Sequence, residues 1–185
     1  MPAYPTILEF DIPVSQSIET RFAAFVATHR ERAVRTAWRL TGSDRSTAEE
    51  VAQDAFLRAH NALHRFRDEA SLNTWFYRIL VRQAANHRRW RGVRDRFART
   101  KGHFVHHNSM PNHADPALRK HINDAVEQLS QKQRSVFVLV YLEGFTLDET
   151  ADIVGCAGGT ARSHLHRALK HLRHELAPLH EESKS

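Results

Sequence analysis

The side chains best suited to chemistry in this sequence lie near its C-terminus and are cationic or hydrogen-bonding. Residues 159–173 contain four arginines and lysines and no acidic residue. A helix turns about 100° per residue, and at that spacing one outward face with its flank would carry Thr160, Arg162, Ser163, His166, Arg167 and Lys170. Such groups suit contacts with phosphates and base edges in the major groove of DNA. The alternative is an ordinary solvated helix face.

The elements around this face favour the DNA interpretation. We expect a short helix at residues 147–154, a left-handed stop at Gly155 and a longer helix that begins after Gly158 and Gly159. The apolar face of the longer helix comprises Ala161, Leu165, Ala168, Leu169 and Leu172. A short helix, a tight glycine turn and an amphipathic second helix form the helix-turn-helix pattern. The C-terminal third is therefore predicted to bind DNA.

A second set of candidate residues lies along an expected helix at residues 72–91. Residues 78–99 contain eight arginines against the single acid Asp95, a local charge of +7. This helix and its basic run carry Trp75, Arg78, Arg82, Asn86, Arg88 and Arg89. Arginines neutralise phosphates, an aromatic ring offers a stacking surface and an amide reads a base edge, which is the combination that single-stranded or melting DNA needs. The alternative for Trp75 is a place in the core.

A third set is acidic. Ser46 and Glu49 have the spacing of a capping box that would open a helix reaching about residue 63. Opposite its alanine-rich core side, this helix would carry Glu50, Gln53, Asp54 and Leu57, spaced by three and four residues. In so basic a protein, this stripe is a candidate dock for a basic protein partner. A merely solvated face is the alternative.

The remaining patterns are also helical, so we expect an all-α fold. Two further capping boxes, Ser130 with Gln133 and Thr146 with Glu149, predict helix starts. The predicted architecture is two small helical domains joined by a flexible linker. Their expected ranges are a tail at 1–20, a first domain at 21–100, a linker without apolar periodicity at 101–115, a helix-turn-helix domain at 116–178 and a tail at 179–185.

Composition restricts the class of partner and compartment. The chain has 185 residues, a net charge of +6 and a pI near 10.0, which favours a polyanionic partner. A single cysteine, Cys156, excludes an internal disulfide and suits a reducing compartment. Residues 1–14 lack the features of a signal peptide, and no apolar run is long enough to cross a bilayer. We expect a cytoplasmic protein without membrane insertion.

Several separate motifs then resemble one known family. The stretch AEEVAQDAFLR at 48–58 resembles the family motif AEDLVQEVFLR, and TWFYRI at 74–79 resembles TWLYRIA. In the second half, LSQKQR, YLEGFT and GTARSHLHRA resemble LPERQR, YLEGLS and GTVKSRLHRA. In this order and spacing, the chain resembles bacterial RNA polymerase sigma factors of the extracytoplasmic-function (ECF) type, which have only sigma regions 2 and 4. The resemblance covers about residues 21–176.

The resemblance implies roles for the three sets. Glu50, Gln53 and Asp54 match positions that dock on the coiled coil of the largest subunit of RNA polymerase core. Residues 68–73 and the helix after them match the part that captures a flipped base of the minus-10 element and promotes strand opening. Arg162, Ser163, His166 and Arg167 match positions that read the minus-35 element as duplex. The family also implies an anti-sigma factor as a partner.

The sequence departs from the family at three positions. Arg82 stands where the family usually has an asparagine associated with the minus-10 base, which puts the promoter preference there in doubt. Ala161 replaces a valine under the recognition helix, and His164 replaces a common arginine.

Two other functions were weighed. A stand-alone helix-turn-helix transcription regulator explains the second half but leaves the acidic stripe and the arginine-rich helix without a role. A metal-dependent enzyme or sensor would use the histidines in and after the linker, namely His103, His106, His107, His113 and His121. Their spacing matches no closed metal site, and Cys156 has no cysteine partner. We therefore expect no metal, no other cofactor and no catalytic activity.

Overall fold

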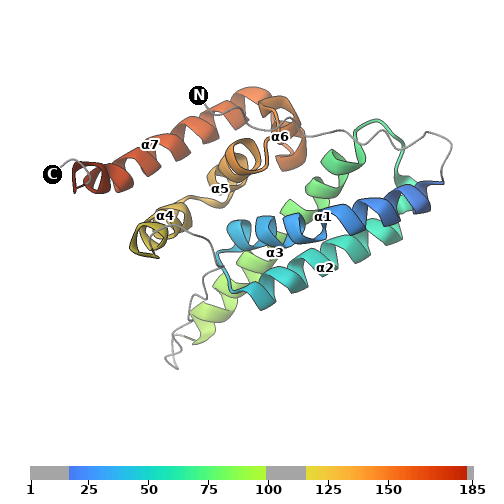
Figure 1. Ribbon diagram of the computed structural model, residues 1–185, viewed down its shortest axis with the longest axis horizontal. Coiled ribbons are helices and arrows are strands. Elements are labelled where there is room, and N and C mark those ends of the chain that lie inside the picture. Colours follow the sequence, from blue (N-terminus) through green and yellow to red (C-terminus); the bar gives the residue numbers. More distant parts are fainter. Residues whose placement is uncertain (1–16, 99–115, 183–185) are drawn as a thin grey trace.

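The computed structural model describes residues 17–98 and 116–182, with side chains placed for 17–92 and 121–177. All regular structure in these ranges is helical, which confirms the all-α prediction (Figure 1). The predicted linker lies outside the described residues, as do residues 1–16 and 183–185 of the predicted tails. The elements are α1 (Ile18–Thr41), α2 (Arg45–Ala62), a 3₁₀ turn (Leu63–Arg65), α3 (Leu72–Ala98), α4 (Pro116–Gln128), α5 (Gln131–Phe137), a π-helical segment (Val138–Leu142), α6 (Leu147–Val154) and α7 (Gly158–Glu182).

The first half is a three-helix unit made of α1, α2 and α3. The core side of α2 is lined with alanines, and small side chains allow neighbouring helices to approach closely. Aromatic rings fill the space beyond them: Phe56 stacks on Phe76 with ring centroids 4.4 Å apart, and Phe25 meets Phe76 edge-on at 5.2 Å. These contacts fix α3, which carries the predicted strand-binding residues, in the middle of the unit.

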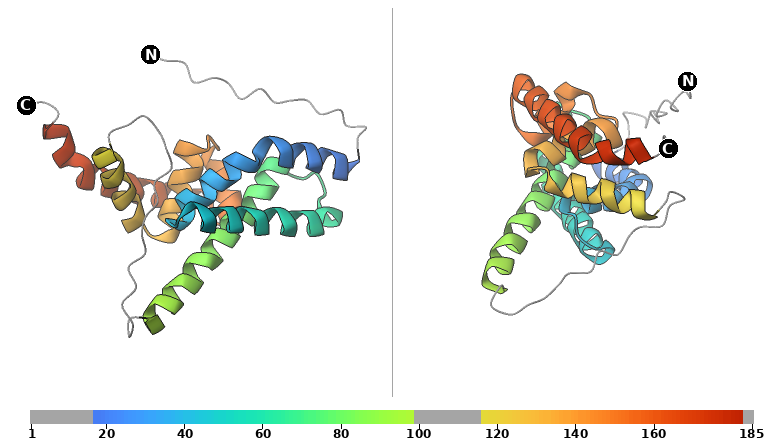
Figure 2. Two further views of the ribbon diagram at one scale, coloured as in Figure 1. Left: turned by 60° about the horizontal axis from the view of Figure 1, so that its bottom comes forward. Right: turned by 90° about the vertical axis from the view of Figure 1, so that its left-hand side faces the viewer.

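The second half consists of α4 to α7, and local signals in the sequence set its helix boundaries. Both predicted capping boxes form, at Ser130 with Gln133 and at Thr146 with Glu149. Gly155 ends α6 in the left-handed conformation at φ 71°, as expected. The longest helix of this half, α7, lies on the side that faces away from α1–α3 (Figures 1 and 2).

The predicted capping box at Ser46 is wrong. Helix α2 begins at Arg45, and its N-cap is Asp44, whose carboxylate accepts a hydrogen bond from the Thr47 amide at 2.7 Å. An aspartate two residues earlier caps as strongly as a serine. Glu49, the expected partner of Ser46, instead accepts a hydrogen bond from Arg45 Nε at 2.7 Å.

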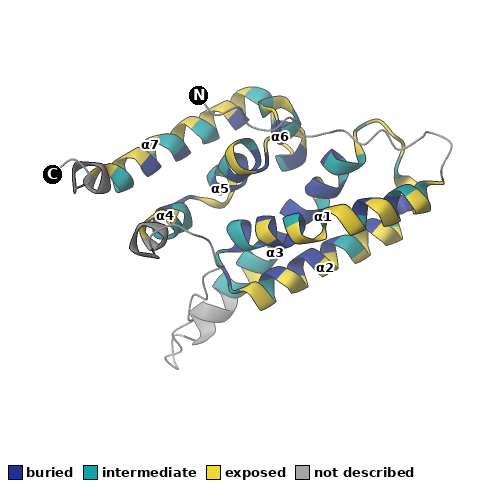
Figure 3. Ribbon diagram, in the orientation of Figure 1, coloured by how far each residue is buried: buried dark blue, intermediate teal, exposed yellow. Residues whose placement is uncertain are grey.

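The hydrophobic core is continuous between the two halves. Val138, Leu139, Phe145 and Ile153 of the second half belong to the same buried cluster as the core residues of α1, α2 and α3. Figure 3 shows the buried residues gathered where these helices and α6 meet. The second half has a smaller cluster of its own, made of Ala125, Leu129, Ala168 and Leu172. The two helical units therefore pack directly on each other.

Candidate nucleic-acid and protein interfaces

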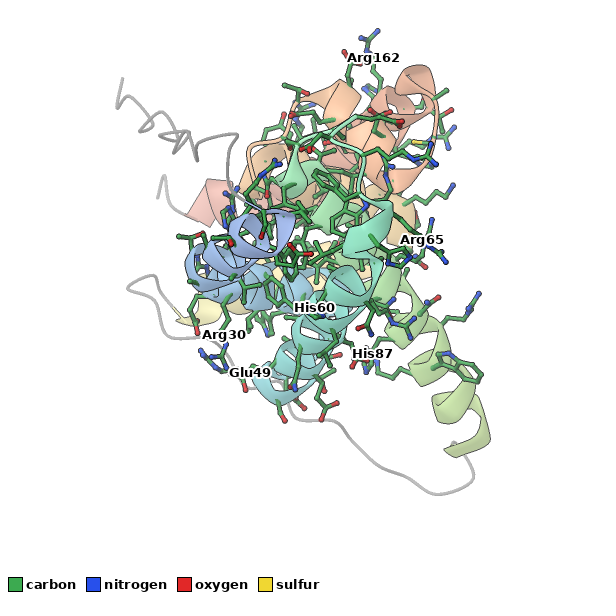
Figure 4. The ribbon with its side chains drawn as sticks, turned by 90° about the vertical axis from the view of Figure 1, so that its right-hand side faces the viewer. Arg30, Glu49, His60, Arg65, His87 and Arg162 are labelled. Carbon is green, nitrogen blue, oxygen red and sulfur yellow. The ribbon has the colours of Figure 1, made fainter. Side chains whose placement is uncertain are left out.

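The reading face of α7 points to solvent along its whole length. We use this name for the predicted set, all of which is exposed: Thr160, Arg162, Ser163, His166, Arg167 and Lys170. On the opposite side, Ala161 and Ala168 are fully buried and Leu172 is nearly so, against the other helices of the second half. Figure 4 shows Arg162 projecting outward from this end of the molecule. Ala161 therefore lies on the buried side of α7, as its position in the apolar repeat predicts.

The turn before α7 holds this face in position. The Gly155 amide donates to the Ala151 carbonyl, and Cys156 N donates to the same carbonyl at 3.0 Å. No atom lies within 4 Å of where a Cβ on Gly155 would be, so the left-handed backbone, and not space, is what favours glycine there. Ser163 Oγ donates to the Gly159 carbonyl at 2.9 Å, which orients the hydroxyl while leaving its lone pairs available.

His164 differs from the arginine usual in the family in charge as well as in shape. Its side chain is half-buried, and burial lowers its pKa, as do the nearby charges of Lys132 and Arg167. A neutral imidazole therefore stands beside the reading face at neutral pH. The positive charge on this part of α7 comes from its arginines and Lys170.

The structure divides the residues predicted on α3. Arg78, Arg82 and Arg89 are exposed, and Asn86 lies half-buried beside them, with its Oδ1 accepting a hydrogen bond from Arg89 at 3.2 Å. We call these four residues the strand ridge. Arg88, on the adjoining face, is half-buried against the second half.

Trp75 packs into the protein. Its ring lies 5.2 Å from that of Phe66 and is one of the partly buried groups around the main core. Of the two interpretations that the sequence left open for Trp75, the structure favours core packing.

Trp90 is an aromatic residue that the sequence analysis missed. Its side chain is 68% exposed, the most exposed of the large hydrophobic residues described. It follows Asn86 by four residues, so it continues the line formed by Arg78, Arg82 and Asn86 on one helix face. The same spacing rule, applied one turn further along the sequence, would have found it.

The acidic stripe of α2, defined as Glu50, Gln53, Asp54 and Leu57, is exposed throughout. Leu57 is 55% exposed, although the alanines on the other side of the helix are buried. No ion pair within the described ranges engages the stripe. Figure 4 shows the neighbouring Glu49 at the opposite end of the view from Arg162, so the acidic and reading surfaces are well separated.

Two family models match the chain. Residues 25–93 match Sigma-70 region 2, and residues 119–172 match Sigma-70, region 4. The chain belongs to the sigma-70 family of RNA polymerase sigma factors and is of the ECF type. This membership confirms the resemblance, and sigma factors act in transcription initiation and are not enzymes. A stand-alone helix-turn-helix regulator does not account for the region 2 match.

Curated relatives support the same assignment. The chain is 30% identical to the RNA polymerase sigma-H factor of Pseudomonas aeruginosa over 74% of its own length and 76% of that protein. It is 30% identical to the sigma-E factor of Streptomyces coelicolor, over 84% of this chain and 85% of the relative. It is also 30% identical to the ECF sigma-E factor of Escherichia coli, over 70% of this chain and 74% of that protein.

Two solved structures share the fold. The sigma factor RpoE from Bartonella quintana, crystallised with the anti-sigma factor NepR, superposes with a TM-score of 0.71 at 24% identity and covers 85% of this chain and 98% of RpoE. CnrH, in complex with the cytosolic domain of CnrY, superposes with a TM-score of 0.63 at 23% identity. The match covers 86% of this chain and 90% of CnrH. The fold of two helical domains is thereby confirmed.

Neither metal-binding nor membrane-spanning elements occur in the described part of the chain. Within it, no group of three or more His, Cys, Asp or Glu side chains is placed to hold a metal ion. Of the five histidines considered above, only His121 has a described side chain, and it is exposed. No helix among the described residues is long and apolar enough to cross a membrane.

Proposed function

We propose that this sigma factor docks on RNA polymerase core through the acidic stripe, binds the separated minus-10 strand along the strand ridge, and reads the minus-35 duplex with the reading face of α7. The observation that carries the proposal is the outward exposure of three separate charged surfaces on three different helices. One surface is acidic and two are cationic, which matches one basic protein partner and two stretches of DNA.

The reading face supplies the groups that duplex recognition requires. Arg162 and Arg167 present guanidinium groups capable of bidentate contact with guanine O6 and N7. Thr160 near the start of α7 offers a hydroxyl to phosphates or base edges, close to the positive end of the helix dipole, and the oxygen of Ser163 can accept a hydrogen bond from a base edge. Because α7 is anchored by its buried alanines, these groups are held at fixed spacing along a groove.

The strand ridge supplies the groups that a single strand requires. Arg78, Arg82 and Arg89 are spaced to follow a phosphate backbone, and Asn86 can hydrogen-bond to a base edge. We assign the stacking surface to the exposed Trp90 in place of Trp75. At position 82, arginine in place of the family's asparagine adds a phosphate contact and removes an amide reader. We therefore expect looser base preference at that position.

The acidic stripe gives the sharpest test of polymerase docking. Asp54→Arg reverses a charge at the centre of an exposed stripe, so we expect the Kd for core polymerase to rise at least about tenfold through like-charge repulsion. Competition binding with labelled wild-type protein measures this change. Glu31→Arg makes the same charge change on α1, and it should leave the Kd unchanged. An unaltered Kd for Asp54→Arg with native helix content would remove the stripe from the proposal.

The whole function is tested by in vitro transcription with purified core polymerase, followed by sequencing of transcript start sites. We expect starts clustered downstream of a shared pair of promoter elements. Starts scattered as with core polymerase alone would contradict the proposal.

An anti-sigma factor completes the proposed set of partners. The two solved structures named above are complexes of a sigma factor or its fold relative with a second protein, and in one of them that protein is named as an anti-sigma factor. Affinity capture with the full chain, followed by transcription assays with each captured protein, tests this assignment. A partner that blocks transcription supports it, and capture of polymerase subunits alone counts against it.

A further inference from the structure

The two halves of the chain meet at a buried carboxylate. Glu143 belongs to the second half, directly before Gly144, and its side chain is 1% exposed. Its Oε2 accepts a hydrogen bond from Arg32 Nε at 2.8 Å, and its Oε1 accepts one from Arg39 Nη1 at 3.1 Å. The hydroxyl of Tyr77 also donates to Oε2, at 3.2 Å, and Arg32 Nη2 donates to the Glu143 carbonyl oxygen. All three donors belong to the first half.

The carboxylate itself is shielded from solvent, while its partners Arg32 and Arg39 remain partly exposed. Phe145 meets Tyr77 edge-on at 4.9 Å, and the guanidinium of Arg32 lies 6.0 Å from the centre of the Tyr77 ring. Burial and the charge of Glu143 raise the pKa of Tyr77, so its hydroxyl stays protonated and remains a donor. We call Glu143 with Arg32, Arg39 and Tyr77 the Glu143 latch. A desolvated ion pair of this kind is sensitive to loss of either partner.

The other end of the same interface holds two arginines, Arg88 and Arg134, and the carboxylate of Glu127 acts on both. Arg134 of α5 is 1% exposed and donates from Nε to the Val126 carbonyl at 3.0 Å. A Cβ on Gly42, at the end of α1, would lie 2.9 Å from Arg134 Nη1, so the two halves approach closely here. Burial and the nearby charge of Arg88 lower the pKa of Arg134 to about 9. Arg88 itself has a buried Nη1 with no hydrogen-bond partner among the described residues.

We infer that the Glu143 latch holds the chain in a closed state in which the second half covers Arg88 and keeps it from DNA. The closed state itself stands on the contacts above, whereas the consequence for DNA rests on the proposed function. Minus-10 and minus-35 elements lie about 25 base pairs apart, roughly 85 Å of duplex. Two halves in direct contact must therefore separate before both elements are bound.

The two ends of the interface act in opposite directions. The latch favours closure. At the other end Arg88 and Arg134 repel each other, the charge of Glu127 offsets part of that repulsion, and Nη1 of Arg88 is buried without a hydrogen-bond partner among the described residues. Phosphates of a bound strand satisfy Arg88 only in the open state. By linkage, strand binding favours opening, and opening favours strand binding by the same factor.

Closure is tested on the full chain in the absence of polymerase and DNA. Spin labels on Arg58→Cys in α2 and Arg173→Cys in α7, in a Cys156→Ser background, report the distance between the halves. We expect Glu143→Gln to raise the ratio of open to closed molecules at least about tenfold, because it leaves the half-buried Arg32 and Arg39 without a counter-charge. Asp152→Asn neutralises an exposed acid on the neighbouring α6 and should leave the distance distribution unchanged.

A second variant separates latch release from a failure to fold. Arg32→Gln with Arg39→Gln removes the same contacts from the first half, so it should open the chain as Glu143→Gln does. Adding Glu143→Gln to this pair should then have little further effect, as expected for residues of one network. Unchanged distances in both the Glu143 and the arginine variants would overturn the latch.

Single-strand binding by the full chain tests the consequence for DNA. A promoter oligonucleotide should bind Glu143→Gln at least about tenfold more tightly than wild type, and Arg88→Ala in the same background should abolish that gain. If the distance between the labels increases but the affinity for the single strand stays constant, the Glu143 latch is supported and the proposed DNA contact of Arg88 is wrong. Failure of the proposed function is thus distinguished from failure of the closed state.

Discussion

The two helices that carry the cationic surfaces, α3 and α7, are placed very differently. Helix α7 lies on the outside of the second half and exposes its whole reading face. Helix α3 runs through the middle of the molecule, contacts α1, α2 and α6, and has Arg88 half-covered. With the roles proposed above, this difference means that the duplex-reading surface would be complete in the closed chain, whereas the strand-binding surface would be completed only when the halves separate.

The largest predicted difference between α3 and α7 concerns binding of single-stranded DNA by the strand ridge. Combined Arg78→Ala, Arg82→Ala and Arg89→Ala should lower the affinity of holoenzyme for single-stranded minus-10 DNA by about 100-fold at 0.1 M salt. The slope of log affinity against log salt should fall by about 2, because three phosphate contacts on a single strand are lost. Fluorescence anisotropy across a salt series measures both quantities.

The matched control removes three exposed arginines that lie off the ridge, with Arg30→Ala, Arg35→Ala and Arg58→Ala. This triple variant should keep the wild-type salt slope. Equal losses in the two triple variants would show that general positive charge, and not the placement of α3, governs strand binding.

A smaller effect, confined to duplex DNA, should follow from Arg167→Ala. Loss of one bidentate contact should cost about 2 kcal/mol and relax specificity at a single minus-35 position. Holoenzyme binding to a panel of duplexes with each base substituted measures this loss. The exposed Arg173→Ala, further along α7, serves as the control. A uniform loss over all sequences would make Arg167 a phosphate contact only.

The smallest effect should come from Trp90 and should concern single strands alone. Trp90→Ala should weaken strand binding by about 1 kcal/mol, the lower end of the range for base stacking, while Trp90→Phe retains most of the affinity. Trp75→Phe is the control, since Trp75 packs against Phe66. Weaker binding of duplex minus-35 DNA by Trp90→Ala would contradict a role restricted to the strand ridge.

Local features of this protein could be predicted from the sequence because they depend on a few neighbouring residues. The capping boxes at Ser130 and Thr146 and the glycine stop at Gly155 each act within one helical turn. The reading face follows from helical periodicity alone. The failure at Ser46 has the same local origin: Asp44, two residues earlier, is an equally good cap, and the sequence does not say which is used.

Long-range features could not be predicted. Glu143 is 111 residues from Arg32 and lies in a turn, where a carboxylate is ordinarily solvated. No periodic pattern marks it as buried, and its partners are spread over two other helices. The burial of Trp75 likewise depends on where Phe66 is placed by the chain between α2 and α3. Both outcomes follow from tertiary packing, which sequence spacing does not contain.

The continuous core also has a consequence for how the chain is made. The first half contains most of that core and emerges first from the ribosome, so it is expected to fold before the second half exists. At ordinary elongation rates the remaining residues take roughly 5–20 s to appear. For that interval the surface around Arg32, Arg39 and Tyr77 is uncovered on the nascent chain. A newly made molecule is thus accessible before it is closed, and partners that act during synthesis meet it in that accessible form.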